Sequence, residues 1–197
     1  MINKRRRGHT RMESVNGVKK CEIHYMSLLP ILLHPDPRLK KLCVPVQSVD
    51  AETRKLADSM IETMYDAPGV GLAAPQVASD ARIFVMDCTD SESDNQPLVL
   101  INPEIISVSE ELNTYSEGCL SLPDLFEDVE RPKQVRMSFL DIDGKQHDEL
   151  FDGLWATCAQ HELDHLNGVL FIDHLSRMKR SMMTKKMVKL KKELALT

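Results

Sequence analysis

The feature that most constrains this chain is a six-residue segment with two histidines four positions apart and a carboxylate directly after the first. The segment runs Gln160-His161-Glu162-Leu163-Asp164-His165. On an α-helix, residues four apart lie on the same face, so His161 and His165 can bind one metal ion. Glu162 is turned by about 100° from His161, toward the position of a metal-bound water. The pattern therefore predicts a helix whose inner face contributes to a metal site, and it is typical of metal-activated hydrolases.

The same spacing also occurs in ordinary amphipathic helices, so the helix alone leaves both interpretations open. Catalytic zinc sites usually have three protein ligands, and two histidines fall short of that number. The longer protease motif His-x-x-Gly-x-x-His is absent, because the chain continues Leu166-Asn167-Gly168-Val169. A third ligand must come from elsewhere in the sequence.

Length and cysteine content limit the class of protein. A chain of 197 residues is long enough for one domain whose core needs no disulfides. The five cysteines are odd in number and form no Cys-x-x-Cys pair, which favours a reducing compartment. No apolar run approaches the roughly 20 residues of a membrane helix, and the N-terminus lacks the apolar core of a signal peptide. We therefore expect a cytoplasmic protein with no membrane partner.

The net charge of −5 hides a strong asymmetry: residues 1–25 carry +5, residues 177–197 carry +7, and the body between them carries −17. This distribution predicts that an end, not the body, meets any polyanion, although Lys-rich terminal helices are often simply solvated. Residues 1–25 show no periodicity, and we predict a disordered basic extension there. Its two glutamates and scarce serines speak against a mitochondrial transit peptide.

Hydrophobic periodicity predicts a single α+β domain. Helices are expected over residues 51–65, about 154–166 and about 178–194, with Asp50 as the first N-cap. Short strands are expected at residues 83–86, 98–101, 135–140 and near 147–151, the last two joined by a turn at Asp143-Gly144.

Two of these helices should be amphipathic. The middle helix is expected to turn one face inward, made of Leu154, Cys158, His161 and His165. The last helix, within a C-terminal segment of residues 177–197, should have opposite apolar and basic stripes. These stripes consist of Met183, Met187, Leu190 and Leu194 on one side and Lys185, Lys189 and Lys192 on the other.

Two further segments contain residue types that a metal site uses. One reads Glu117-Gly118-Cys119-Leu120-Ser121, followed by Leu122-Pro123, where a turn is expected. The other reads Gly69-Val70-Gly71-Leu72-Ala73-Ala74-Pro75-Gln76. With the histidine helix, these segments resemble the three signature motifs of the peptide deformylases, in the same order and with similar spacing. The resemblance covers about residues 27–195, and the combination is far more specific than any one motif.

This resemblance implies a fold, an activity and a metal site. The fold would be mostly antiparallel β-sheets packed around a central metal-binding helix in residues 26–176, followed by the C-terminal amphipathic helix. The activity would be hydrolysis of the formyl group from the N-terminal formyl-methionine of nascent polypeptides, with release of formate. The implied metal ligands are Cys119, His161 and His165, with Glu162 as general acid/base. One divalent ion is expected; the resemblance favours Fe²⁺ in the cell, and these ligands also accept Zn²⁺, Ni²⁺ or Co²⁺.

The resemblance also assigns residues around the metal. The backbone N–H of Leu120 and the amide of Gln76 are implied as donors to the tetrahedral oxyanion. Glu117 is expected to pair with Arg131, which would support the Glu-Gly-Cys turn. Independently of the resemblance, Asp164 is a candidate to accept a ring N–H from a ligand histidine, since such histidines commonly donate to a carboxylate; an exposed helix carboxylate is the equal alternative.

Substrate binding is expected at the glycine segment, where an extended strand can pair with a peptide. Its residues Gly69, Val70 and Gly71 are joined by other implied substrate-binding positions, which are Glu117, Gly118, Arg131, Leu154, Thr157 and Cys158. On its own, a cysteine on an apolar helix face is more often a small core residue. By resemblance, the basic C-terminal helix is expected to dock on ribosomal RNA.

Three competing interpretations remain at this point. The pattern Gly69-x-Gly71-x-x-Ala74 matches a relaxed dinucleotide fingerprint, but a predicted helix precedes it and Pro75 disfavours a helix after it, so no nucleotide cofactor is expected. A zinc endopeptidase would not need Cys119. A non-catalytic ribosome-binding metalloprotein would need neither Glu162 nor Gln76.

Overall fold

The computed structural model describes residues 28–90 and 94–196, so the predicted extension over residues 1–25 lies outside the described residues. The elements in chain order are η1 (Pro37–Lys40), α1 (Ala51–Asp66), β1 (Gly71–Ala73), η2 (Ala74–Val77), β2 (Ile83–Met86), β3 (Leu98–Val108), β4 (Leu112–Cys119), β5 (Leu122–Pro132), β6 (Gln134–Leu140), β7 (Gln146–Asp152), α2 (Gly153–Leu166), η3 (Phe171–His174) and α3 (Arg177–Leu194).

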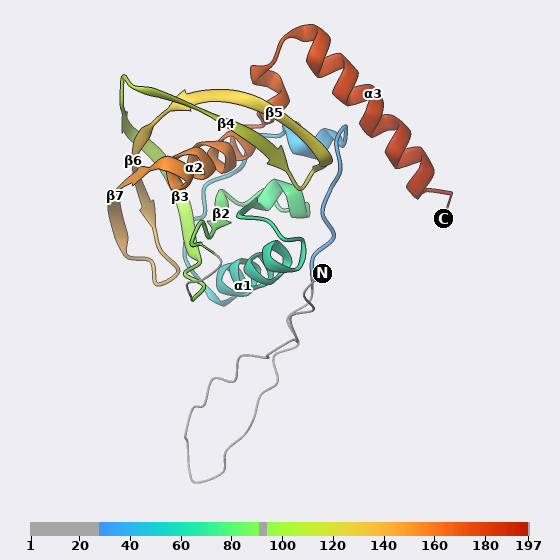
Figure 1. Cartoon of the computed structure of the whole chain (residues 1–197). Coiled ribbons are helices and arrows are strands. Elements are labelled where there is room, and N and C mark those ends of the chain that lie inside the picture. Colours follow the sequence, from blue (N-terminus) through green and yellow to red (C-terminus); the bar gives the residue numbers. More distant parts are fainter. Residues whose placement is uncertain (1–27, 91–93, 197) are drawn as a thin grey trace, which may run out of the picture.

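Two antiparallel sheets lie around α2 (Figure 1). The larger has the strand order β1-β2-β3-β6-β7, and the smaller is the β4–β5 hairpin. Helix α2 contacts strands of both sheets, so the histidine helix is enclosed as the sequence predicts. The single domain of antiparallel sheets around a central helix, followed by a C-terminal helix, confirms the expected α+β class.

The predicted helices and strands form where local signals are strong. Asp50 caps α1 by accepting a hydrogen bond from the backbone N–H of Thr53 at 2.9 Å, and Met60 and Met64 are buried on its inner face. The predicted strands are all present, with β3 extending well beyond its expected end. The turn between β6 and β7 contains Gly144, whose positive φ of 76° suits glycine.

The sequence prediction misses the β4–β5 hairpin. Leu122 and Pro123 begin β5, so the turn expected there is wrong; the chain turns at Leu120 and Ser121. Both strands are rich in polar residues, and their pairing with each other, rather than their own composition, defines them. The register shifts between Gly118 and Cys119, next to the expected metal ligand.

The C-terminal helix α3 projects from the body (Figure 1) and is attached by only part of its apolar stripe. Met183 and Met187 are buried in a cluster that also contains Leu39 and Phe171, whereas Leu194 is 55% exposed. The stripe is therefore shorter than expected at its C-terminal end. Among residues 28–90 and 94–196, no helix combines the length and apolar character needed to cross a bilayer.

Candidate metal centre

Helix α2 presents two buried imidazoles to the inside of the molecule. The Asp152 side chain accepts a hydrogen bond from the Gly153 N–H and caps the helix start. At the other end, Gly168 has a φ of 72°, and a Cβ there would lie 2.6 Å from the Lys40 carbonyl oxygen. Between these ends, the rings of His161 and His165 lie with centroids 5.0 Å apart. The helix is thus fixed at both ends, which orients the two rings.

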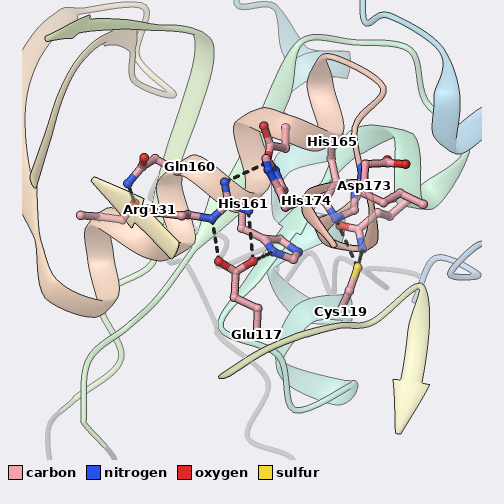
Figure 2. Close-up of polar contacts among 12 residues, drawn as sticks. Glu117, Cys119, Arg131, Gln160, His161, His165, Asp173 and His174 are labelled. Atoms are coloured by element: carbon pink, nitrogen blue, oxygen red, sulfur yellow. Dashed lines mark hydrogen bonds and ion pairs between the residues drawn. The ribbon is translucent and has the colours of Figure 1, made fainter. Parts of the chain in front are cut away.

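The β4–β5 hairpin brings Cys119 to these histidines. The Cys119 Sγ lies 3.2 Å from the His165 Nε2, and one potential ligand atom from each of Cys119, His161 and His165 lies within 4.8 Å of the other two (Figure 2). A thiolate and two imidazoles form a donor set that suits Zn²⁺, Fe²⁺, Ni²⁺ or Co²⁺. The fold therefore assembles, from segments about 40 residues apart, a possible site for one metal ion.

Glu162 lies buried between this cluster and strand β1. A Cβ at Gly71 would lie 2.3 Å from the Glu162 Oε1, so only glycine fits at that position. Burial raises the pKa of the Glu162 carboxyl to about 7. Its Oε2 is buried without a hydrogen-bond partner among the described residues, as is the Nδ1 of His165. Buried polar atoms normally have partners, and a metal ion with its water would supply one for Glu162, so the residues fit such an ion.

The carboxylate that orients a candidate ligand histidine is Glu117. The His161 Nδ1 lies 2.8 Å from the Glu117 Oε2 (Figure 2). Arg131 donates to the same carboxylate, from Nε at 2.6 Å and from a terminal nitrogen at 3.1 Å, which confirms the expected Glu117–Arg131 pair. Burial disfavours the Glu117 anion, but hydrogen bonds from His161 and Arg131 outweigh it and lower the pKa of Glu117 to about 2. Glu117 therefore stays ionised behind His161.

Asp164 does not accept from a ligand histidine, so that expectation is wrong. Its Oδ2 accepts from Arg131 at 2.8 Å and lies 2.7 Å from the His174 Nε2. Asp164 directly precedes His165 on the helix, so its side chain is turned away from the face that His161 and His165 share. Asp164 instead forms a salt bridge with the Arg131 guanidinium.

Gln76 lies beside the sulfur of Cys119. Its Nε2 donates to the Cys119 Sγ at 3.4 Å and to the Ser121 Oγ at 3.2 Å, while its Oε1 accepts from the Ala73 N–H at 2.8 Å. This last bond fixes which end of the amide faces the cluster. Leu120, the other expected donor, occupies the turn directly after Cys119.

The expected substrate-binding residues fall into two groups. Thr157 and Cys158 are buried, and the Cys158 thiol donates to the Val70 carbonyl at 3.5 Å. Val70 and Leu154 are 47% and 42% exposed, so the inward orientation expected for Leu154 is wrong. Leu154 lies in the first turn of α2.

The remaining residues of this set also differ in their surroundings. Gly69 packs against the Leu120 side chain, and Gly118 lies under the exposed ring of Phe126. Glu117 and Arg131 are buried and paired with each other, which places them behind His161.

Three residues near the cluster have no role in the sequence prediction. Ser121 is fully buried and accepts from Gln76, and Gln160 donates to the carbonyls of Pro132 and Ala156, each at 2.9 Å. His174 contacts Asp164 from η3. Ser121 and Gln160 lie next to predicted metal ligands in the sequence, and this proximity was the only local signal of a role near the site. His174 lies near no predicted ligand in the sequence.

The fold and the cluster together define a class: a metal-dependent hydrolase whose histidine helix is completed by a cysteine from a neighbouring hairpin. The family model of polypeptide deformylase matches residues 28–181. The chain belongs to the polypeptide deformylase family, enzymes that remove the N-formyl group from nascent peptides. The zinc endopeptidase and the non-catalytic alternative are not favoured.

Individual relatives agree over most of the chain. A peptide deformylase from Rhodopseudomonas palustris (strain BisB18) is 54% identical over 166 residues, which is 83% of this chain and 95% of that protein. The crystal structure of a peptide deformylase from Legionella pneumophila has a TM-score of 0.80 at 41% identity and covers 87% of this chain and 99% of that one. The peptide deformylase from Ehrlichia chaffeensis in complex with actinonin has a TM-score of 0.79 at 40% identity and covers 84% and 98%.

Proposed function

We propose that Cys119, His161 and His165 hold one divalent metal ion, Fe²⁺ in the cell, and that Glu162 is the general acid/base of deformylation. The convergence of the three ligand atoms within 4.8 Å carries this proposal. When bound, such an ion supplies Lewis acidity and lowers the pKa of its water toward roughly 7. The Glu117–Arg131 pair holds the His161 ring in a fixed orientation.

Glu162 moves the proton in this scheme. It takes a proton from the attacking water and later delivers it to the leaving amine of the peptide, so that formate and a free N-terminus result. A carboxyl whose pKa is near 7 populates both forms at neutral pH and can serve both steps. Burial next to Gly71 supports this role, because it keeps bulk water from the carboxyl.

Two donors are proposed for the developing oxyanion, the Gln76 amide and the Leu120 N–H. The hydrogen bond from Ala73 to the Gln76 carbonyl oxygen holds the amide nitrogen toward Cys119. Removing one preorganised donor of this kind costs about 3–4 kcal/mol of transition-state stabilisation in other hydrolases.

The formylated peptide is proposed to add to the free edge of β1. In the described part of the chain, β1 is the terminal strand of its sheet and pairs with β2 alone. The exposed side chains of Val70 and Leu154 and the buried Thr157 and Cys158 are proposed to line the methionine site, beside Gly69, Gly71 and Gly118. The actinonin complex of the Ehrlichia chaffeensis relative supports a ligand site in this fold.

The decisive experiment is anaerobic purification with metal analysis, followed by a formate-release assay on a formyl-methionyl peptide. Glu162→Gln should retain the metal and lose about 10²–10⁴-fold in turnover. Cys119→Ala should lose the metal. The same substitution at the half-exposed Glu149 should change neither quantity. Full turnover in the Glu162→Gln variant would sink the acid/base assignment.

We also propose that the protein is cytoplasmic. Residues 26–176 are proposed as the catalytic domain, and α3, within residues 177–197, is proposed to dock on ribosomal RNA. The exposed lysines of α3 and the nascent-chain substrate of the family support this proposal. Deleting α3 is a poor test, because Met183 and Met187 are buried.

A charge-only variant tests the docking without disturbing the core. Lys186→Gln with Lys192→Gln should weaken co-sedimentation with ribosomes, and the loss relative to the wild-type protein should become smaller as the salt concentration rises. The matched pair Lys55→Gln with Lys145→Gln removes the same charge from exposed sites on the body. Equal binding of the two double variants would contradict a role for α3.

A further inference from the structure

A pocket lies where α3 meets the N-terminal part of the domain, and none of the proposed active-site residues lines it. It has a volume of about 400 Å³. Its walls come from the segment around His34, from η1 and η3, and from residues 177–185 of α3. Its charged side chains are Lys40, Asp173, Arg177, Arg180 and Lys185.

The pocket has an excess of positive charge. Its one carboxylate, Asp173, is paired with Lys40 and with Arg180. Arg177 and Lys185 form no ion pair with any described residue, so their charges are not compensated within the described part of the chain. A pocket with four cationic side chains and one anionic side chain favours an anionic ligand.

The helix places these groups on one side. Arg177, Ser181 and Thr184 are separated by four and three residues, so they lie above one another on the same face of α3. The Thr184 Oγ1 lies 3.0 Å from the His34 Nε2, so this contact joins α3 to the N-terminal segment at the wall of the pocket. Arg177 and Arg180 lie in the first turn of this 18-residue helix, where the helix dipole adds to the positive potential.

We propose that this pocket is a phosphate-binding site. Guanidinium groups match phosphate oxygens in pairs, ammonium groups add charge, and hydroxyls of Ser181 and Thr184 are suited to the remaining oxygens. The pocket is larger than one phosphate group, so it has room for the organic part of a phosphate ester. The ligand is a free phosphate or phosphomonoester, or a backbone phosphate of RNA; the chemistry of recognition is the same.

Inorganic phosphate is the first probe, titrated by calorimetry into the metal-loaded full-length protein at low ionic strength. Saturable binding is expected. Arg177→Gln with Lys185→Gln should weaken it by roughly tenfold or more, because both charges are otherwise unpaired. The control Lys55→Gln with Lys145→Gln removes the same charge from exposed positions on the body, outside this pocket, and should change the affinity less than about twofold. Circular dichroism confirms that both variants fold.

No saturable phosphate binding by the wild-type protein, or an equal loss in both double variants, overturns the proposal. A short RNA hairpin then separates the two sources of phosphate. If RNA competes with phosphate, and Arg177→Gln with Lys185→Gln weakens RNA binding more than the control does, the ligand is a backbone phosphate. If phosphate binding is lost but RNA binding is unaffected, the ligand is a small phosphate. Neither outcome depends on the deformylase assay or on ribosome binding.

Discussion

Helices α2 and α3 are both rich in polar residues, yet the domain uses them in opposite ways. On α2 most residues are buried, and apart from Glu162 the charged groups around the helix are paired with one another, as in the series from His161 through Glu117 and Arg131 to Asp164. On α3 only Met183 and Met187 are buried, and most lysines face outward. A buried charge is costly without a partner, whereas an exposed charge on α3 needs none, and some of these charges, such as Arg177 and Lys185, form no ion pair with any described residue.

Removing the central cation of the buried network should have the largest effect. Arg131→Met leaves the buried carboxylate of Glu117 without its main partner, and a loss of about 3–5 kcal/mol in the free energy of unfolding is expected. Urea denaturation of the metal-loaded protein measures it. Arg136→Met, the same change at an exposed pair with Asp148, should cost less than about 1 kcal/mol. Similar losses for the two variants would erase the contrast between buried and exposed charge.

The second-largest loss of stability is expected from weakening the attachment of α3 to the body. Met187→Ala opens a cavity in the cluster under the helix, and about 2–5 kcal/mol of stability should be lost. On the same helix, Met182 is 49% exposed, and Met182→Ala should change the free energy of unfolding by no more than about 0.5 kcal/mol. Urea denaturation again measures both. If the two cost the same, α3 is not held by its methionine stripe.

Acidification should weaken the contact between α3 and the body. Burial and the charge of Lys40 lower the pKa of His34, whose Nε2 contacts Thr184. Because the folded state binds this proton less readily than the unfolded state, stability should fall as the pH drops from about 6.5 through the lower folded pKa. The difference in unfolding free energy between pH 7.5 and pH 5 should be smaller in His34→Gln; an unchanged difference would assign the effect to other groups.

The smallest effect is expected on the outer face of α3. Lys189→Gln removes an exposed pair with Glu193 at 3.8 Å, and the free energy of unfolding should stay within about 0.5 kcal/mol of the wild-type value. Thermal unfolding monitored by circular dichroism checks this. A larger loss would show that the basic face stabilises the domain and is not simply available to a ligand.

Local patterns explain which parts of the molecule were predictable. The start and end of α2, the cap on α1 and the pairing of β6 with β7 follow from periodicity, capping residues and turn residues within short segments. The β4–β5 hairpin did not follow, because its strands are polar and are stabilised by each other. The exposed position of Leu154 was missed for a similar reason: helical spacing defines a face but not how far the domain covers it.

The sequence by itself determined the family and the convergence expected of Cys119, His161 and His165, because three ordered motifs carry that information. Only the tertiary structure decided which carboxylate serves His161. The sequence offered Asp164, a neighbour along the helix, as one candidate, but the fold brings Glu117 from a separate strand to that ring, and Asp164 binds Arg131. The basic pocket under α3 is likewise formed by residues far apart in the chain. Periodicity reports contacts within one element, while partners of buried charge are selected by packing between elements.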